Sequence, residues 1–510
     1  MTAVILGIQI GSSKVRVKAY DLSGGLRAKG VELLRIYHEQ PHQHELDAEE
    51  LWSSTCIAIQ KCMQELKEAS ILSIGVSSVG ESHVMLDQYD APLGRVIVWY
   101  DQRATQQAAA LRQCIGEERI YGITGQFISP KFGICKSMWI RDNMPELYAK
   151  IRSVLTLHDY IIYRLTGKKL TEYSVASRMM CFNIEKLEWS KELLQFAKIP
   201  EDCFPEVVPG ASAAGSIRIE ASRLTGLQTG IPVFTGGHDH ACAAVAVNIF
   251  QDDVMMDSMG SAETTMVAME NRLDMEKGFQ NQIAVYPHFG SKLFRAVTSI
   301  QAFGVVFDWL KRWMYSGEAG VDDALFLQLL QQINLDDQPS KNLLFMPHLR
   351  GLQEFAGASG VFFGIDETCS CQTMVRAVAE GLSFELRRRT DACEKAFGRD
   401  FYSVRAVGEY SSQPLLMSTK SAIIAKQIET ISQADAITYG AALMGALGAG
   451  IISEADLQDF FRPNGEYVSE YRAIKRYQKK YEQYLKVFEQ LLPVYALFND
   501  IIENFKEEMA

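Results

Sequence analysis

The chain has 510 residues, of which 47% are hydrophobic and 22% are charged, and its formal net charge is −11. A chain of this length exceeds what one hydrophobic core usually supports, so we expect two large domains with a ligand-binding cleft between them. The acidic balance disfavours a nucleic-acid partner, because phosphate backbones require a basic surface.

The absence of a long apolar run and the pattern of cysteines indicate a protein of the cytoplasm. No apolar run reaches the roughly 18 residues that a membrane-spanning helix needs, so we predict no membrane partner. The ten cysteines lack metal-ligand spacing and are expected to be reduced thiols. The run of three arginines at 387–389 is expected on a solvated helix face.

The first predicted element is a hairpin at the N-terminus. Val4 to Ile10 is strand-like, Gly11, Ser12 and Ser13 form a turn, and Lys14 to Tyr20 alternates charged with apolar residues. A Gly-Ser-Ser turn offers backbone N–H groups and two hydroxyls, which suits a phosphate group. A plain hairpin needs no ligand in its turn, so both interpretations stay open on this stretch alone.

Polar residues at the ends of the next two predicted strands indicate a pocket for a sugar or polyol. Glu81 and His83 follow the first strand, and Trp99 and Asp101 follow the second. Carboxylate, imidazole and indole groups bind polyhydroxyl ligands through paired hydrogen bonds and an aromatic face. Each residue also has a structural explanation, with Trp99 in the core and Asp101 in a surface ion pair with Arg103.

The most informative stretch is 235–245, which contains one acidic residue, Asp239. Its glycines predict a turn between the apolar run 231–234 and a small-residue segment that begins a helix. This geometry presents a carboxylate where it can take a proton from a bound hydroxyl. An aspartate just before a helix is as often an N-cap, so base and cap are alternatives here.

A second hairpin of the same kind follows in the second half of the chain. Asp253 to Met259 and Thr264 to Met269 are strand-like, and the turn between them begins with Gly260 and Ser261. Two similar hairpins predict duplicated halves, each directing a small-residue loop toward a shared nucleotide.

The segment 466–510 is predicted to form helices packed on the outside of the second domain, and it leaves a homodimer contact open. The apolar residues at helical spacing include Tyr477, Tyr481, Tyr484, Leu485, Phe488 and Leu491.

Further motifs occur between and after the hairpins, namely Asp159 to Gly167, Trp189-Ser190, Gly226 to Val233, Pro347 to Gly351, Gly360 to Gly364, Arg376 to Gly381, and Gly440 to Leu443 before Gly445. In this order, the chain resembles the FGGY family of carbohydrate kinases from Val4 to about Gly450. The resemblance implies an α/β fold of two duplicated ribonuclease-H-like (actin-like ATPase) domains with an interdomain cleft. Residues 1–247 would carry the sugar pocket and first phosphate loop, and residues 248–510 the nucleotide side.

The resemblance also implies the reaction, which is phosphorylation of a hydroxyl group on a sugar, ketose or polyol by ATP with Mg²⁺. Asp239 looks like the general base and also a substrate contact, and it can hold the metal through water. Glu81, His83, Trp99 and Asp101 are the other expected substrate contacts. The expected nucleotide-binding residues are Gly11, Ser12, Ser13, Gly260, Ser261, Gly304 and Gly408.

Two departures from the family pattern concern metal and nucleotide. Gln9 stands where most members have an aspartate associated with Mg²⁺, and an amide would hold the ion less firmly than a carboxylate. Glu409 and Tyr410 replace glycines of the adenosine motif. These changes motivate an alternative, a catalytically weakened sugar-binding sensor or pseudokinase of the same fold. An actin-like or chaperone ATPase is a weaker third reading.

Overall fold

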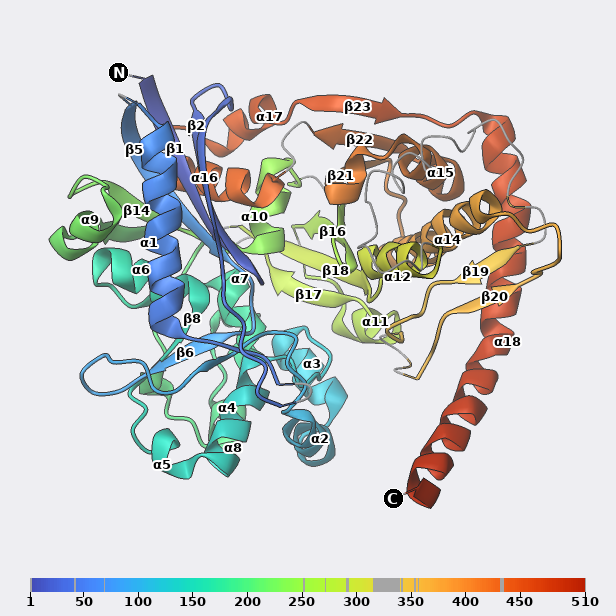
Figure 1. Cartoon of the computed structure of the whole chain (residues 1–510), viewed down its shortest axis with the longest axis horizontal. Helices are drawn as coiled ribbons and strands as arrows, with labels where there is room; N and C mark the ends of the chain where they lie inside the picture. Colours follow the sequence, from blue (N-terminus) through green and yellow to red (C-terminus); the bar gives the residue numbers. More distant parts are fainter. Residues whose placement is uncertain are drawn as a thin grey trace.

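Two β-sheets, one from each half of the chain, form the framework of the protein (Figure 1). The computed structural model describes residues 2–40, 43–67, 69–250, 253–270, 272–289, 293–314, 340, 343–352, 355, 357–431 and 435–509. The first sheet has the strand order β13-β14-β5-β1-β2-β3, and the second has the order β17-β18-β16-β15-β21-β22-β23.

The strands of the first sheet are β1 (Thr2–Ile10), β2 (Lys14–Asp21), β3 (Leu26–Leu33), β5 (Ala69–Ser78), β13 (Ala213–Ser216) and β14 (Pro232–His238). Those of the second are β15 (Val254–Met259), β16 (Glu263–Met269), β17 (Ala284–Pro287), β18 (Phe294–Ile300), β21 (Ser403–Gly408), β22 (Gln427–Ile431) and β23 (Pro463–Tyr467). The main helices are α1 (Ala48–Glu65), α6 (Leu157–Thr166), α10 (Asp239–Ala246), α12 (Gly304–Met314), α14 (Cys371–Phe397), α15 (Pro414–Ile424), α16 (Ala436–Gly448) and α18 (Tyr471–Met509).

The first half contains most of the remaining elements. They are β4 (Glu45–Leu46), β6 (His83–Leu86), β7 (Val96–Ile97), α2 (Thr105–Cys114), α3 (Glu117–Thr124), α4 (Gly133–Asn143), α5 (Pro145–Tyr148), β8 (Ser153–Thr156), β9 (Leu170–Glu172), α7 (Tyr173–Ala176), β10 (Phe182–Asn183), β11 (Glu188–Trp189), α8 (Lys191–Ala197), β12 (Glu206–Val208) and α9 (Ile219–Thr225). The second half adds α11 (Met275–Gln280), β19 (Leu344–Met346), β20 (Val361–Phe363) and α17 (Leu457–Phe460).

The two sheets repeat one topology. In the first sheet β1, β2 and β3 are antiparallel, and β5 and β14 follow in parallel beside β1. In the second sheet β15, β16 and β18 are antiparallel, and β21 and β22 follow in parallel beside β15. Both predicted hairpins are present, and the duplicated α/β fold with ribonuclease-H-like halves is confirmed.

Helices α10 and α16 pack against each other between the two halves (Figure 1). A Cβ atom added at Gly440 would lie 1.7 Å from the Cys242 carbonyl oxygen, so only glycine allows this approach. Helix α16 also lies on the first sheet, where a Cβ at Gly75 would lie 1.8 Å from the Ala441 carbonyl oxygen. The small-residue motif at 440–443 therefore serves the close packing that joins the halves.

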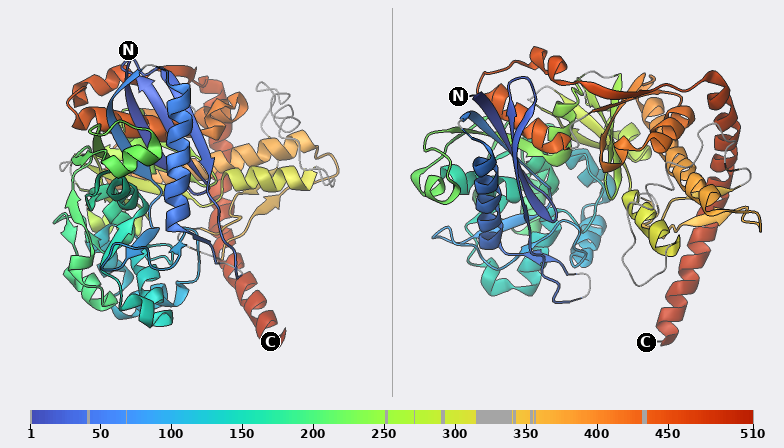
Figure 2. Two further views of the ribbon diagram at one scale, coloured as in Figure 1. Left: turned by 60° about the vertical axis from the view of Figure 1, so that its left-hand side comes forward. Right: turned by 45° about the horizontal axis from the view of Figure 1, so that its top comes forward.

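Helix α18 runs along the outer side of the second half, and its end projects beyond the body of the protein (Figures 1 and 2). Its buried side chains include Tyr477, Tyr481, Tyr484, Phe488 and Leu491, so the predicted apolar face does pack. The prediction was wrong at the start of the segment, because Glu466 lies in β23, which pairs with β22. In the described part of the chain, no helix is both long and apolar enough to cross a membrane.

The arginine run 387–389 does not form a solvated face, which corrects the expectation. Arg389 is 4% exposed and its Nε lies 3.2 Å from a Glu385 carboxylate oxygen. The guanidinium groups of Arg387 and Arg388 stand over the rings of Tyr481 and Phe488, at 4.2 and 4.3 Å from the ring centres. Because α18 covers this side of α14, the arginines join the two helices.

Candidate active site

The candidate site lies where the parallel strands of the first sheet end. Ile10, Ser78 and His238 are paired across β1, β5 and β14 and are the last residues of these strands. The segments that follow them are the first loop (Gly11 to Ser13), the turn to Glu81, and Asp239. Carboxyl ends of parallel strands are where α/β sheets bind ligands. The sheet therefore brings three separate sequence motifs to one edge.

Asp239 is the first residue of α10, and the residue is 8% exposed. It accepts hydrogen bonds from Ser77 Oγ at 3.0 Å and from Gln9 Nε2 at 3.2 Å. The N-cap of α10 is His238, so the helix-cap explanation of Asp239 is wrong. Burial raises the pKa of Asp239 to about 7, while the two hydrogen bonds oppose the rise. A carboxyl with this pKa is suited to accept a proton near neutral pH.

The glycines before Asp239 form a bulge within β14 rather than the separate turn expected from the sequence. The pairing of β14 with β5 shifts register between Thr235 and Gly237. A Cβ at Gly236 would lie 2.2 Å from the Val76 carbonyl oxygen, and Gly237 has a φ of 142°. Both positions exclude other residues, because β14 runs this close to β5 and bends before α10.

Gln9 connects Asp239 to a cation. Its Nε2 donates to Asp239, and its Oε1 accepts from Arg16 Nη1 at 2.7 Å. An amide can do this because it has both a donor and an acceptor, whereas a carboxylate at position 9 would face Asp239 as a like charge. Since Arg16 occupies the amide oxygen of Gln9, Asp239 is the carboxylate available here to a magnesium ion. Such an ion keeps most of its waters and is held in part by substrate phosphates. The residues fit that kind of binding, and the described ranges contain no group of three side chains able to hold a metal alone.

The first loop is a tight turn closed by the bond from Gly11 N–H to the Lys14 carbonyl oxygen, at 3.0 Å. Ser13 is exposed and Ser12 is half-buried. Trp99 Nε1 donates to Ser12 Oγ at 2.8 Å. The polar edge of Trp99 thus contacts the loop, which links the expected substrate and phosphate regions.

Glu81 lies in a left-handed backbone conformation, with a φ of 64°, directly after β5. For a residue with a side chain this costs about 1–3 kcal/mol, and such strain gathers at functional sites. The Glu81 carboxylate pairs with Arg178, which also donates to Tyr286 Oη at 2.5 Å. Although burial opposes it, the Arg178 charge lowers the pKa of Glu81. Arg178 was not identified from the sequence.

His83 and Asp101 are both buried and already bonded within the protein. His83 Nε2 lies 3.1 Å from Ser137 Oγ, and burial lowers the pKa of His83 to about 3, so the ring is neutral. Asp101 pairs with Arg103 at 2.8 Å and accepts the His44 backbone N–H at 2.7 Å. This pair is 0% and 6% exposed at its side chains, so the expected surface ion pair is a buried one.

The second loop (Gly260 to Ala262) lies against two other predicted glycines. Gly304 begins α12 and its N–H donates to the Gly260 carbonyl oxygen at 3.0 Å. Gly408 is paired with Met259, and a Cβ there would lie 2.2 Å from the Met259 carbonyl oxygen. With a φ of 100°, Gly408 is also in a conformation that favours glycine. The structure thus brings Gly260, Ser261, Gly304 and Gly408 together.

The altered adenosine motif divides into one exposed and one packed side chain. Glu409 is exposed, whereas the ring of Tyr410 stacks on Phe307 at 5.2 Å and meets Phe303 edge-on at 5.4 Å. Tyr410 also comes within 3.1 Å of the Cβ position at Gly304. It therefore fills space beside the second loop.

A buried ion cluster beneath the second loop was missed by sequence reasoning. Lys420 Nζ donates to Asp257 Oδ2 at 2.6 Å and also contacts the Glu263 carboxylate. All three side chains are 0% exposed. Burial and the neighbouring Asp257 raise the pKa of Glu263 well above its ordinary value. Strand-interior charges at Asp257 and Glu263 were the available signal, but their partner is more than 150 positions away.

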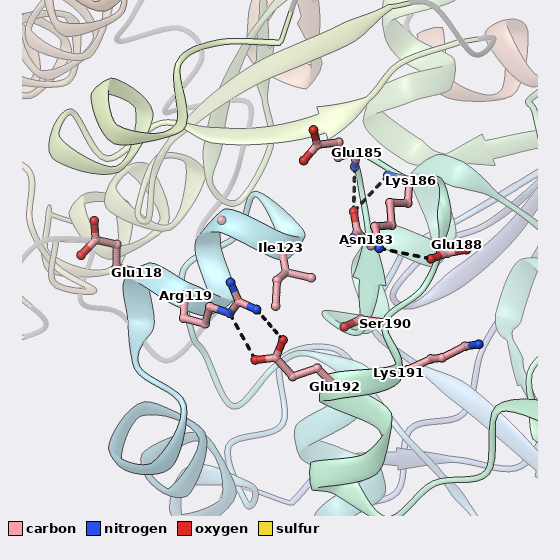
Figure 3. Close-up of a pocket in the computed structure, with 11 residues that line it drawn as sticks. Glu118, Arg119, Ile123, Asn183, Glu185, Lys186, Glu188, Ser190, Lys191 and Glu192 are labelled. Atoms are coloured by element: carbon pink, nitrogen blue, oxygen red, sulfur yellow. Dashed lines mark hydrogen bonds and ion pairs between the residues drawn. The ribbon is translucent and has the colours of Figure 1, made fainter.

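A surface pocket of about 700 Å³ lies elsewhere, between α3, β10 and α8 (Figure 3). It is lined by charged side chains that pair with one another, such as Arg119 and Glu192 at 2.8 Å. None of the predicted site residues lines it. We place the candidate site at Asp239, where the ends of β1, β5 and β14 meet.

The FGGY family of carbohydrate kinases matches this chain with its N-terminal domain over residues 4–246 and its C-terminal domain over residues 255–449. The chain belongs to this family and is a carbohydrate kinase, a phosphotransferase that acts on a sugar. Members of the family use ATP as co-substrate.

Individual relatives agree over nearly the whole length. Xylulose kinase of Staphylococcus epidermidis is 25% identical over 96% of each chain. L-xylulose/3-keto-L-gulonate kinase of Escherichia coli is 26% identical over 95% of this chain and 96% of its own. The crystal structure of gluconate kinase from Lactobacillus acidophilus has a TM-score of 0.88 at 22% identity, covering 98% of this chain and 100% of its own. This structural likeness shows the fold.

Proposed function

We propose that the protein transfers the γ-phosphoryl group of ATP to a hydroxyl group of a sugar, ketose or polyol, with Asp239 as the general base. The observation that carries this proposal is the buried Asp239 carboxyl with a pKa of about 7, at the shared end of β1, β5 and β14. Relatives named for xylulose, gulonate and gluconate kinases support an acceptor of this size.

In the proposed mechanism Asp239 accepts the proton of the attacking hydroxyl as the new bond to phosphorus forms. Ser77 and Gln9 orient the carboxylate through their hydrogen bonds. Backbone N–H groups of the first and second loops would face the phosphates, where fixed dipoles stabilise developing charge. Mg²⁺, when bound, would neutralise phosphate charge, with Asp239 holding it through water.

We assign Glu81, His83, Trp99 and Asp101 to the acceptor side and Gly11, Ser12, Ser13, Gly260, Ser261, Gly304 and Gly408 to the nucleotide side. Residues 1–247 form the proposed N-terminal domain and residues 248–510 the C-terminal domain. The cytoplasmic location and a homodimer stay predictions. Exposed Leu497 and Phe498 on the projecting end of α18 are where a homodimer contact is best sought.

The test is Asp239→Asn, which keeps the shape of the side chain and removes the base. We expect ADP release that depends on the sugar to fall by about 10²- to 10⁴-fold, while sugar binding measured by calorimetry stays within a few fold. Asp202→Asn is the matched control, because Asp202 is exposed. Near-normal turnover in Asp239→Asn would exclude the assigned role.

The alternative of a sugar-binding sensor rests on Gln9 and Glu409. Measurements on the wild-type protein distinguish the sensor from the kinase. Saturable binding of a sugar without ADP release, at saturating ATP and Mg²⁺, favours the sensor, and release without any sugar favours an ATPase.

A further inference from the structure

Three cations gather beside the candidate acceptor site, joined through two aromatic rings. Lys131 Nζ and the Arg178 guanidinium each lie 5.2 Å from the centre of the Phe132 ring. Arg178 and Arg295 in turn lie 5.1 and 5.3 Å from the centre of the Tyr286 ring. The cations thus form one continuous row that crosses from the first half of the chain to the second.

This row lies against the segment that carries Asp239. A Cβ at Gly80 would lie 2.4 Å from Arg178 Cγ and 3.0 Å from His238 Cδ2, so both side chains pack on Gly80. Lys131, Arg178 and Arg295 all act, after burial, to lower the pKa of His238 and that of His240, which flank Asp239. The two imidazoles are therefore neutral and add no positive charge of their own.

The positive charge of the row is only partly balanced. Arg178 pairs with Glu81, but Lys131 has no hydrogen-bond or ion-pair partner among the described residues. Arg295 is 2% exposed, and its Nε and Nη1 have no hydrogen-bond partner in the described ranges. The carboxyl of Glu172 acts electrostatically on Arg295, but burial raises the pKa of Glu172, which weakens it as a counter-charge.

Buried or half-buried cations without acceptors cost free energy that a bound anion offsets. Lys131 is half-buried, and burial lowers the pKa of its ammonium group to about 8, so the group is still mostly charged at pH 7. The Arg295 guanidinium is enclosed. A neutral sugar would leave this charge uncompensated, whereas a carboxylate on the substrate would pair with it.

We propose that the preferred acceptor is a sugar acid, a polyhydroxy carboxylate, whose carboxylate group pairs with Lys131 while one of its hydroxyls faces Asp239. Arg178 and Arg295 contribute the positive field that favours the anion. This inference rests on the proposed function, because it takes the surroundings of Asp239 as the acceptor site.

The experiment compares matched ligands by calorimetry without nucleotide. Gluconate and glucitol, and xylonate and xylitol, differ in each pair by a carboxylate in place of a hydroxymethyl group. We expect at least one aldonate to bind about 10- to 100-fold more tightly than its alditol, as for a hydrogen bond to a charged group. If neither aldonate binds more tightly than its alditol, the proposal is overturned.

Variants then assign the preference to Lys131. Lys131→Met should bring aldonate binding to within about threefold of alditol binding, while Lys131→Arg should retain the preference. Lys150→Met, at an exposed lysine, is the control. A preference that survives in Lys131→Met would overturn the assignment, as would a rise in KM for ATP without a change in aldonate binding.

The outcome is separable from that of the proposed function. If the protein phosphorylates a neutral ketose or alditol but no aldonate, the proposed kinase activity stands and the sugar-acid preference is overturned. If aldonates bind tightly but no ADP is released, the proposed anion site stands and the proposed transferase activity is overturned.

Discussion

The two glycine loops share one topology but differ in the charges behind them. Behind the first loop, Gln9 bridges Arg16 and Asp239 at the open end of the sheet. Behind the second loop, Lys420, Asp257 and Glu263 form a cluster that is sealed from solvent. A duplicated scaffold thus has a titratable carboxyl at the sheet edge on one side and a closed ion cluster on the other.

This difference separates two tasks. Asp239 must change its protonation during the proposed reaction, which requires a pKa near neutrality. The Lys420 cluster pairs two carboxyl groups of adjacent antiparallel strands with one ammonium group, and this arrangement holds β15, β16 and α15 together under the loop. We infer that the second half supplies rigidity and the first half supplies the proton acceptor.

The largest effect on stability is expected from a substitution that breaks the sealed cluster of Lys420, Asp257 and Glu263. Lys420→Met should lower the free energy of unfolding by about 3–5 kcal/mol, because it leaves the carboxyl groups of Asp257 and Glu263 buried without their cation. Burial already raises the pKa of Glu263, and Lys420 opposes that rise, so without Lys420 the loss should be greater at pH 8 than at pH 5. Urea unfolding at both pH values, with Lys486→Met as an exposed control, measures this. An equal loss at both pH values would contradict the electrostatic cause.

The pH dependence of the rate tests whether Asp239 titrates as the first half of the comparison requires. The base is active when ionised, so kcat/KM should rise about tenfold per pH unit up to about pH 7 and then level off. Rates between pH 5 and 9 on a sugar that does not titrate there provide the measurement. A flat profile over pH 5–7 would mean that Asp239 does not limit the step. The residual activity of Asp239→Asn should lack this rise.

Placing a second carboxylate behind the first loop would make the two halves more alike in charge. Gln9→Asp should tighten apparent Mg²⁺ affinity by about tenfold, or 1.4 kcal/mol, because it offers the ion a second hard ligand near Asp239. Without the metal it should raise the pKa of Asp239, since two like charges would adjoin. Titration of activity against Mg²⁺, with Gln106→Asp as an exposed control, checks the first effect. Unchanged or weaker metal dependence would count against this description of the site.

The smallest effect is expected when a loop glycine, Gly11 or Gly260, is replaced by alanine. A Cβ at Gly11 would lie 3.0 Å from the Lys14 carbonyl oxygen, whereas one at Gly260 would have its nearest neighbour at 3.7 Å. Gly11→Ala should therefore cost about 1 kcal/mol of unfolding free energy and Gly260→Ala less than about 0.5 kcal/mol. Urea unfolding of both variants measures the difference. A larger cost at Gly260 would show that the second loop is the tighter one.

Sequence patterns predicted the framework because local signals specify it. Alternating and continuous apolar runs marked the strands of both hairpins, and their recurrence indicated the duplicated halves. The position of Asp239 was found because glycines and small residues surround it. The bulge in β14 before Asp239 was not predicted, since it depends on how closely β14 approaches β5 at Gly236.

Only the tertiary structure decided which partners the charged side chains have. Asp239 and Gln9 are 230 positions apart, Lys420 and Asp257 are 163 apart, and Arg178 and Glu81 are 97 apart. No local pattern encodes such pairs, because the sheet edge brings them together after the strands align. The sequence by itself therefore determined the family, the duplicated α/β scaffold and the candidate base. Tertiary packing decided the environment of that base, since burial raises its pKa and the hydrogen bonds from Ser77 and Gln9 oppose the rise.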